Sequence, residues 1–236
     1  MDFYEVLARY YDQIFPLKAA QQGFLKRYFG EHNPSSVLDV GCGTGSVALA
    51  VSDWGIRTVG IDLSREMIEI ARQRATALNS SAQFFMKNML ELGSFQDDFD
   101  SIICLGNTFV HLITTEQLEK ALSLFKQKAD HLLVQIVNYD RILAQNVSQL
   151  PEITTSELTF RRFYNHLPDG LIEFSTELHL LEENETIKAA NLLRPLTRPQ
   201  LTQLLEHAGW ESLTWFGSYA GEVWSEDSPA TIVKAE

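Results

Sequence analysis

The residues best suited to chemistry lie in a glycine-rich turn that follows an apolar stretch. Residues 37–45 read Val-Leu-Asp-Val-Gly-Cys-Gly-Thr-Gly, and a helical pattern follows them. Glycine is needed where a backbone takes positive φ or touches a ligand, and a helix N-terminus offers free N–H groups. Asp62 ends the next apolar run, 21 residues after Gly41, where a carboxylate can accept hydrogen bonds from both hydroxyls of a ribose. The turn and this acid together predict a nucleotide-like ligand.

The acidic residue upstream of the glycines separates two classes of ligand. A dinucleotide fingerprint has the spacing G-x-G-x-x-G, whereas this turn has G-x-G-x-G with Asp39 just before it. A carboxylate at Asp39 suits a ligand that carries an ammonium and a sulfonium better than one that carries a pyrophosphate. The sequence therefore favours a sulfonium ligand, and nicotinamide-dependent reduction is the competing interpretation.

The segments around the turn alternate between short apolar runs and helical patterns. Such alternation indicates βαβ units, whose right-handed crossovers place helices on both faces of a parallel sheet. We expect an α/β fold, Rossmann-like and doubly wound, with seven strands. The expected strands span residues 37–40, 58–61, 83–86, 101–105, 132–137, 211–216 and 230–234, and the expected helices include 46–54, 66–78 and 116–129. Capping signals support three helix starts: Ser64, Thr114 with Gln117, and Thr197 with Gln200.

A different pattern interrupts this alternation between the fifth strand and the last helix. Residues 158–164 and 171–180 alternate in polarity on either side of the turn signal Pro168-Asp169-Gly170, which is typical of an antiparallel hairpin. We expect an antiparallel β insertion that forms a lid over the edge of the sheet where ligands bind. The chain is expected to be one domain over residues 1–236. It comprises an N-terminal helical cap at 1–30, a Rossmann-like core at 31–138 and 195–236, and the β insertion at 139–194.

Composition restricts the partners of the 236-residue chain. Apolar residues make up 45% of it, so a buried core forms easily, and the formal net charge is -12. A strongly acidic surface repels phosphate backbones and anionic lipid, so we expect neither a nucleic acid nor a membrane as partner. No signal-peptide-like or membrane-spanning run is present, and Cys42 and Cys104 lack metal-type spacing. We therefore expect a cytoplasmic monomer or homodimer without a metal.

Three motifs carry a resemblance to a known family. Residues 37–45, 60–62 and 99–105 resemble the successive motifs of class I S-adenosylmethionine-dependent methyltransferases, and the resemblance extends over nearly the whole chain. Residues 105–112 and 138–143 are similar to glycine N-methyltransferase and its sarcosine-acting relatives. The resemblance implies that the cofactor is S-adenosylmethionine. It also implies that the acceptor is a small molecule, methylated at an amine nitrogen.

The resemblance also assigns roles to individual residues. It implies that the glycine turn approaches the methionine half of the cofactor, that Asp62 holds the ribose, and that Leu63 and Met67 pack on the adenine. Asn88 takes the place of the usual acidic residue that faces the adenine amino group. The implied cofactor-binding residues are Asp39, Gly41, Gly43, Asp62, Leu63, Met67, Asn88, Met89, Leu105 and Gly106, and the implied catalytic residues are Asn107, His111 and Tyr11. For His111 the alternative is a packing or capping histidine, and for Tyr11 an ordinary aromatic anchor.

One position departs from the glycine-methylating relatives. There an arginine precedes the Asn-Tyr-Asp sequence and pairs with the substrate carboxylate, whereas this chain has Val137. Because valine cannot neutralise a buried anion, this departure argues against glycine as the acceptor. Arg161, Arg162 and Arg194 in the insertion could supply a charge, although arginines of this kind more often lie solvated on the surface.

Several functions remain open at this level. They are a non-catalytic sensor or partner protein that binds S-adenosylmethionine, an O- or C-methyltransferase of a small metabolite, and a protein methyltransferase.

Overall fold

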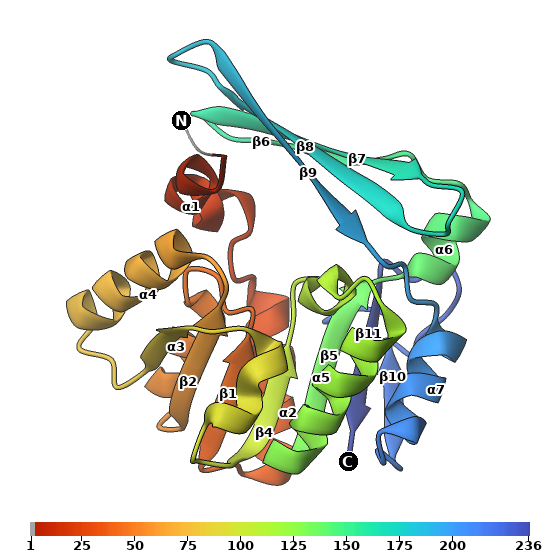
Figure 1. The fold of residues 1–236 in the computed structure, drawn as a ribbon. Helices are drawn as coiled ribbons and strands as arrows, with labels where there is room; N and C mark the ends of the chain where they lie inside the picture. The colour runs from red at the N-terminus through yellow and green to blue at the C-terminus, as the bar shows by residue number, and fades with distance from the viewer. Residues whose placement is uncertain (1–2) are drawn as a thin grey trace.

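The structure is a computed structural model that describes residues 3–236, and it contains two sheets (Figure 1). The larger sheet has seven strands in the order β10-β11-β5-β4-β1-β2-β3. This is the α/β fold with a Rossmann-like sheet that the sequence predicts. Its strands are β1 (Ser36–Val40), β2 (Arg57–Asp62), β3 (Gln83–Met86), β4 (Phe99–Cys104), β5 (Ala129–Val137), β10 (Leu213–Phe216) and β11 (Ala230–Ala235).

The strand order places the glycine turn at the switch point of the sheet. β1 pairs in parallel with both β2 and β4, so the chain leaves β1 between two strands that run in the same direction. Asp39 is opposite Gly60 on β2 and Ile103 on β4. Open α/β sheets bind ligands in the crevice outside the carboxyl ends of their strands at such a point. The turn and the residues that follow β2, β4 and β5 therefore share one edge.

Helices cover both faces of this sheet. α2 (Ala19–His32), α3 (Ser46–Asp53) and α4 (Arg65–Ala77) pack on one face, where Phe24, Leu25 and Phe29 of α2 lie against β1, β4 and β5. α5 (Thr115–Lys128) and α7 (Arg198–His207) pack on the other face and bury the largest apolar cluster. Two short 3-10 helices, η1 (Met89–Ser94) and η2 (Thr108–His111), follow β3 and β4. Among the described helices, none is long and apolar enough to cross a membrane.

The predicted capping residues begin the predicted helices. The Ser64 hydroxyl accepts a hydrogen bond from the Met67 N–H at 3.2 Å, and Gln117 Oε1 accepts one from the Thr114 N–H at 3.3 Å. Gln200 Oε1 accepts in the same way from the Thr197 N–H at 2.9 Å. These contacts satisfy N–H groups that a helix leaves without intrahelical partners, so local chemistry sets where the helices start.

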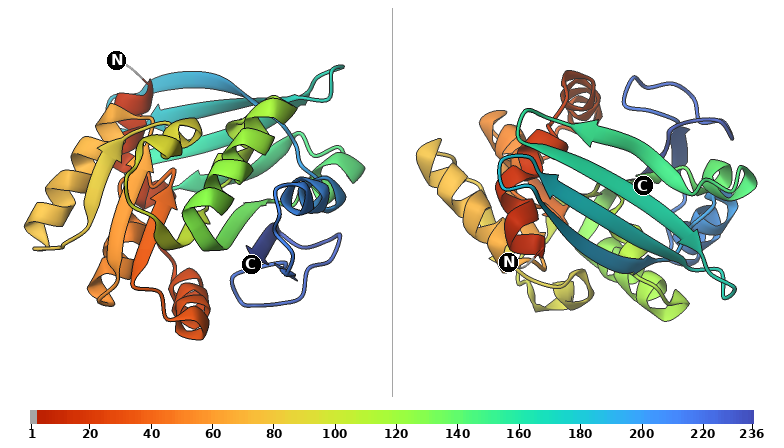
Figure 2. Two further views of the ribbon diagram at one scale, coloured as in Figure 1. Left: turned by 60° about the horizontal axis from the view of Figure 1, so that its bottom comes forward. Right: turned by 90° about the horizontal axis from the view of Figure 1, so that it is seen from above.

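The second sheet lies above the carboxyl ends of the first and is here called the roof sheet. It is antiparallel in the order β6-β7-β8-β9, with β6 (Gln149–Thr154), β7 (Leu158–His166), β8 (Ile172–Leu180) and β9 (Glu185–Leu193). Seen from above, its strands cross over the top of the molecule (Figure 2). The expected hairpin is β7 with β8, while β6 and β9 extend it on either side. A short helix, α6 (Tyr139–Ala144), precedes β6 at the start of the insertion.

The first helix closes one end of the space beneath the roof sheet. α1 (Phe3–Ile14) packs its apolar face against the roof sheet and against α4 (Figure 1). Phe3 and Leu7 share a buried cluster with Phe160 of β7 and Leu178 of β8. α1 therefore connects the roof sheet to α4, whereas α2 covers one face of the large sheet.

Candidate active site

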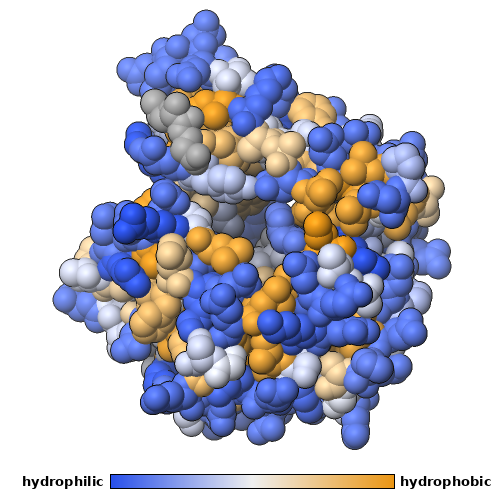
Figure 3. All heavy atoms as spheres, in the orientation of Figure 1, coloured by the Kyte–Doolittle hydropathy of each residue, from blue (hydrophilic) through white to orange (hydrophobic). Residues whose placement is uncertain are grey.

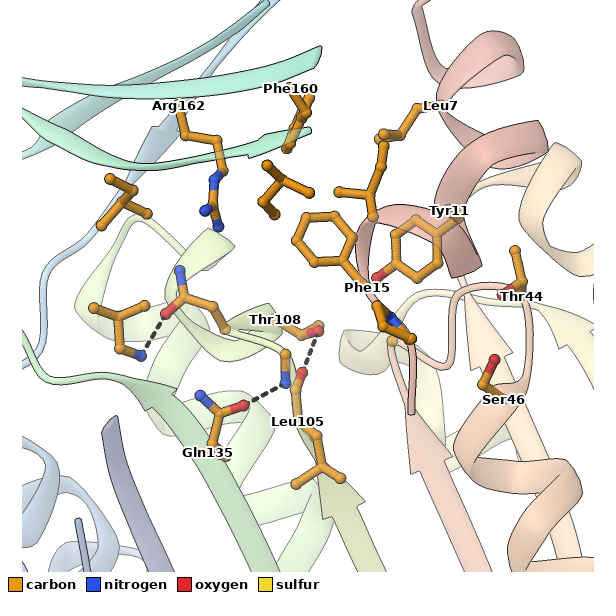
Figure 4. Close-up of a pocket in the computed structure, with 18 of the residues that line it drawn as sticks. Leu7, Tyr11, Phe15, Thr44, Ser46, Leu105, Thr108, Gln135, Phe160 and Arg162 are labelled. Atoms are coloured by element: carbon orange, nitrogen blue, oxygen red, sulfur yellow. Dashed lines mark hydrogen bonds between the residues drawn. The ribbon is translucent and has the colours of Figure 1, made fainter. Parts of the chain in front are cut away.

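A cavity of about 710 Å³ lies between the roof sheet and the carboxyl ends of β1, β4 and β5. Figure 3 shows the molecule hollowed beneath the roof, and Figure 4 shows the side chains inside. The volume falls within the range of about 300–1,000 Å³ that is common for small-molecule sites. The predicted site residues in its lining are Tyr11, Asp39, Gly41, Leu105, Gly106, Asn107 and His111.

The glycine turn is packed so tightly that side chains are excluded. Gly41 has φ 73°, and a Cβ atom there would lie 2.3 Å from Cγ2 of Thr108. Gly43 has φ 54°, and a Cβ atom there would lie 3.0 Å from Cε1 of Tyr11. Positive φ and these approaches are both accessible only to glycine at low cost. The turn thus lies directly beneath the Tyr11 ring.

Asp62 is held in place by the turn that it faces. Its Oδ2 accepts a hydrogen bond from the Gly43 N–H at 2.9 Å, and its Oδ1 accepts one from the Ser64 N–H at 2.9 Å. Burial raises the pKa of Asp62, while these backbone hydrogen bonds act in the opposite direction. The next side chain, Leu63, is 66% exposed, so an apolar surface stands beside the carboxylate. This pair suits a ribose with an attached planar ring.

Asp39 is buried and incompletely satisfied. Burial and repulsion from Asp62 raise its pKa to about 7, and a hydrogen bond from the Ala48 N–H opposes that shift. Its Oδ2 atom has no hydrogen-bond partner among residues 3–236. A buried carboxylate oxygen without a donor costs free energy, and a cationic group in the cavity would offset that cost. The site therefore fits a cofactor that carries an ammonium beside the turn.

Asn107 joins the ends of β4 and β5. It takes a left-handed conformation with φ 70°, its Oδ1 accepts from the Val137 N–H at 2.9 Å, and its Nδ2 donates to the Tyr139 hydroxyl at 3.0 Å. Gly106, one residue earlier, donates its N–H to Oε1 of Gln135 at 2.8 Å. These contacts give Asn107 a structural task, and they hold it at the floor of the cavity.

The catalytic candidates Tyr11, on α1, and His111, on η2, both line the cavity. Burial and nearby carboxylates, with Asp62 foremost, raise the pKa of Tyr11, so its hydroxyl stays protonated. His111 ends η2, and desolvation lowers its pKa while the Asp62 charge opposes the shift. Because the ordinary histidine pKa is about 6.5, His111 is neutral at pH 7 and can accept a proton.

Three predicted cofactor-binding residues, Met67, Asn88 and Met89, lie outside the lining of the cavity, and each already has a structural environment. Met67 is buried in the cluster that joins α1 to the roof sheet, and Met89 is buried in the large apolar cluster beneath α5. Asn88 caps η1 with its Oδ1, which accepts from the Leu90 N–H at 2.9 Å. Gly43, Asp62 and Leu63 also lie outside the lining, so the predicted cofactor residues extend along the edge of the sheet beyond the turn.

Several residues of the lining were not predicted from the sequence. Arg162 was considered only as one of three arginines, and Tyr164, Gln135, Phe15 and Tyr219 were not considered. A signal for part of the set was present, because Phe160, Arg162 and Tyr164 alternate along one expected strand and must share a face. Nothing in the pattern indicated which face turns toward the cavity.

Comparisons with known proteins agree on one family. A family model described as "Methyltransferase domain" matches residues 37–132. A protein of Geobacillus sp. (strain WCH70) that is named as a methyltransferase is 31% identical over 204 residues, which cover 75% of this chain and 81% of that protein.

A glycine/sarcosine N-methyltransferase of Aphanothece halophytica is 26% identical over 210 residues, or 87% of this chain and 77% of the relative. The structure is also similar to that of an S-adenosylmethionine-dependent methyltransferase from Clostridium acetobutylicum. The TM-score is 0.83 at 16% identity, and the match covers 100% of this chain and 99% of that one.

Proposed function

Since this chain belongs to the class I S-adenosylmethionine-dependent methyltransferases, we propose that it methylates a small molecule at an amine nitrogen. The observation that carries this proposal is the cavity that extends from the glycine turn to the inner face of the roof sheet. A covered cavity of this size admits a small acceptor and excludes a folded macromolecule. Relatives named for glycine and sarcosine N-methylation support nitrogen as the atom methylated.

The residues of the turn would hold the cofactor, which supplies a methyl group on a positively charged sulfur when bound. Asp62 and Leu63 would receive the ribose and the adenine, and Asp39 would face the ammonium of the methionine part. Gly41 and Gly43 would let the backbone approach that part closely. Tyr11, stacked over Gly43, would shield it from water.

The acceptor nitrogen needs orientation more than it needs a strong base. Its lone pair forms the new N–C bond as the S–C bond breaks, and the extra proton leaves the nitrogen afterwards. His111 is neutral and lines the cavity, so it can take that proton, directly or through water. An oxygen or carbon nucleophile would need its proton removed earlier, by a stronger base. Positioning of the two reactants can contribute about 7–11 kcal/mol to catalysis, which suits a site built mainly for orientation.

A combined binding and product assay tests this proposal. Isothermal titration should show binding of S-adenosylmethionine, and NADH should not bind. Mass spectrometry should then detect methylated products from a panel of small primary and secondary amines. Binding without turnover across amines, alcohols and carbon acids would favour a non-catalytic sensor, and turnover of alcohols alone would refute the amine assignment.

A further inference from the structure

Arg162 is a positively charged residue of the roof sheet that lines the cavity. It lies on β7, and its side chain points from the roof sheet down into the cavity (Figure 4). Phe160 and Tyr164 flank it on the same face of the strand, and all three line the cavity. The guanidinium is therefore presented to whatever occupies the space between the roof sheet and the ends of β4 and β5.

Among residues 3–236, Arg162 forms no salt bridge with an acidic side chain. Its Nη2 donates to the backbone oxygen of Pro151 at 2.8 Å, and its buried Nε has no hydrogen-bond partner within the described chain. None of the carboxylates of residues 3–236 forms a salt bridge with it, whereas the neighbouring Arg161 pairs with Glu152 at 2.5 Å. Desolvation lowers the pKa of Arg162, against the opposing effect of Tyr164, because a partly buried guanidinium loses contact with water. An anion in the cavity would compensate for that loss.

The floor of the cavity has no positively charged side chain comparable to Arg162 among the described residues that line it. Val137, at the end of β5, lines the cavity with an apolar side chain. The other ionisable groups that could be cationic there are His111, which is neutral at pH 7, and Lys18, which is exposed at the start of α2. Arg162 is thus the one guanidinium in the described lining, and a single planar guanidinium matches a monovalent carboxylate.

We infer that Arg162 binds a carboxylate of the acceptor, so that the acceptor is a small amino acid held by its acid group from the roof sheet. This inference rests on the proposed amine methylation and specifies its substrate class. The carboxylate lies against Arg162, and the amine points down toward Asn107 and His111 on the floor. The distance between Arg162 and the floor of the cavity therefore sets the distance between the carboxylate and the amine of the acceptor.

Matched substrate pairs test the inference directly. Glycine, β-alanine and 4-aminobutyrate are compared with their primary amides, which keep the amine and lose the charge. The wild-type protein should prefer at least one acid over its amide about tenfold or more in kcat/KM. Arg162→Gln should abolish that preference, mainly through KM, and leave the affinity for S-adenosylmethionine within about twofold. Arg162→Lys should restore it in part, because lysine keeps the charge and loses the planar fork.

Arg161→Gln serves as the matched control. It removes the same charge from the adjacent residue, which faces away from Arg162 on the strand and pairs with Glu152, a part-exposed residue that also lines the cavity. This variant should keep the acid preference. A second measurement needs no turnover: with S-adenosylhomocysteine saturating, acetate should raise the melting temperature of the wild-type and Arg161→Gln proteins and leave that of Arg162→Gln unchanged.

The outcomes separate this inference from the proposed function. The Arg162 role is refuted if Arg162→Gln keeps the acid preference, if acetate stabilises that variant as much as the wild type, or if the wild type shows neither effect. Equal turnover of acids and amides would leave amine methylation standing without the anchor. Acetate binding that depends on Arg162, without methylation of any amine, would leave the anchor standing and refute the amine acceptor.

Discussion

The carboxylate of Asp12 accepts a hydrogen bond from Nη1 of Arg74 at 2.8 Å, which ties the end of α1 to α4. The same carboxylate accepts hydrogen bonds from the hydroxyl of Thr44 in the glycine turn at 2.9 Å and from that of Ser46, the residue after the turn, at 2.5 Å. One acidic residue of the first helix therefore fixes that helix to the cofactor-binding edge. Asp12 thus helps to hold its neighbour Tyr11 over the turn, together with the packing of the Tyr11 ring on Phe15.

Replacement of Asp12 by alanine should loosen α1 without unfolding the protein. Three hydrogen bonds are lost, each with a net contribution of about 0.5–1.5 kcal/mol, and the Tyr11 ring is no longer held over Gly43. We expect faster hydrogen exchange in Phe3–Ile14 and an affinity for S-adenosylmethionine reduced by about tenfold. Asp53→Ala, which removes an exposed carboxylate of α3, is the control. Unchanged exchange in α1 would show that its apolar face alone holds it.

Replacement of Asp62 by alanine should weaken S-adenosylmethionine binding by more than tenfold. The carboxylate is preorganised by the Gly43 and Ser64 N–H groups, and its loss removes charge-assisted hydrogen bonds of about 1–3 kcal/mol to the ribose. Isothermal titration measures the effect, and the melting temperature of the free protein reports any damage to the turn. An unaltered affinity would refute the ribose role.

Asp39→Asn should change stability and cofactor affinity in opposite directions. The folded-state pKa of Asp39, about 7, lies above the ordinary value of about 3.9, so folding stability is lost as pH rises between these values. At pH 8 the neutral amide should therefore raise the melting temperature of the free protein. It should also weaken S-adenosylmethionine binding, because the ammonium loses its counter-charge. If affinity at pH 8 is the same in both proteins, Asp39 does not pair with the cofactor.

The half-buried His32, whose ring stacks on that of His131, should make the protein less stable in mild acid. The two rings stack at a centroid distance of 4.0 Å. Desolvation, followed by the charges of His131 and Lys234, lowers the pKa of His32. Glu236 and Glu31 act in the opposite direction. The unfolded chain then binds more protons, so the free energy of unfolding falls as pH drops below about 6.5.

Urea unfolding at pH 7.5, 6.5 and 5.5 measures this loss. His32→Gln should show a smaller loss than the wild type, while the exposed control His207→Gln should follow the wild type. The same pH dependence in all three proteins would place its origin elsewhere in the chain.

Val137→Arg should move the acceptor anchor from the roof sheet to the floor. An arginine at the end of β5 would present its charge to the same cavity, which Val137 lines, and would restore the residue that the resemblance to glycine-methylating proteins implies there. In the Arg162→Gln background it should restore turnover of short amino acids relative to their amides. The assay is again kcat/KM on the matched pairs, and a double variant as unselective as Arg162→Gln would contradict the comparison at this position.

Local patterns in the sequence were sufficient for the α/β class, the first five strands and the capped helices. Apolar runs, glycines and capping residues act over a few neighbours, and their effect is readable from spacing. The strand expected at 83–86 is β3 as observed, and the other four expected strands differ from β1, β2, β4 and β5 by at most three residues at either end. The same spacing placed Asp62 opposite the glycine turn, where it accepts from Gly43.

Contacts between distant segments decided the rest. β11 inserts antiparallel between β5 and β10, a direction that no local pattern encodes. Met67 is covered by a helix that begins some sixty residues earlier, and Asp12 reaches a turn more than thirty residues away. The sequence by itself determined the order of strands and helices and the positive-φ glycines of the turn, because these depend on neighbouring residues. Only the tertiary structure decided that Arg162 turns inward, without a salt bridge to any carboxylate of residues 3–236, because the face that a strand presents depends on the sheet and helix against which it packs.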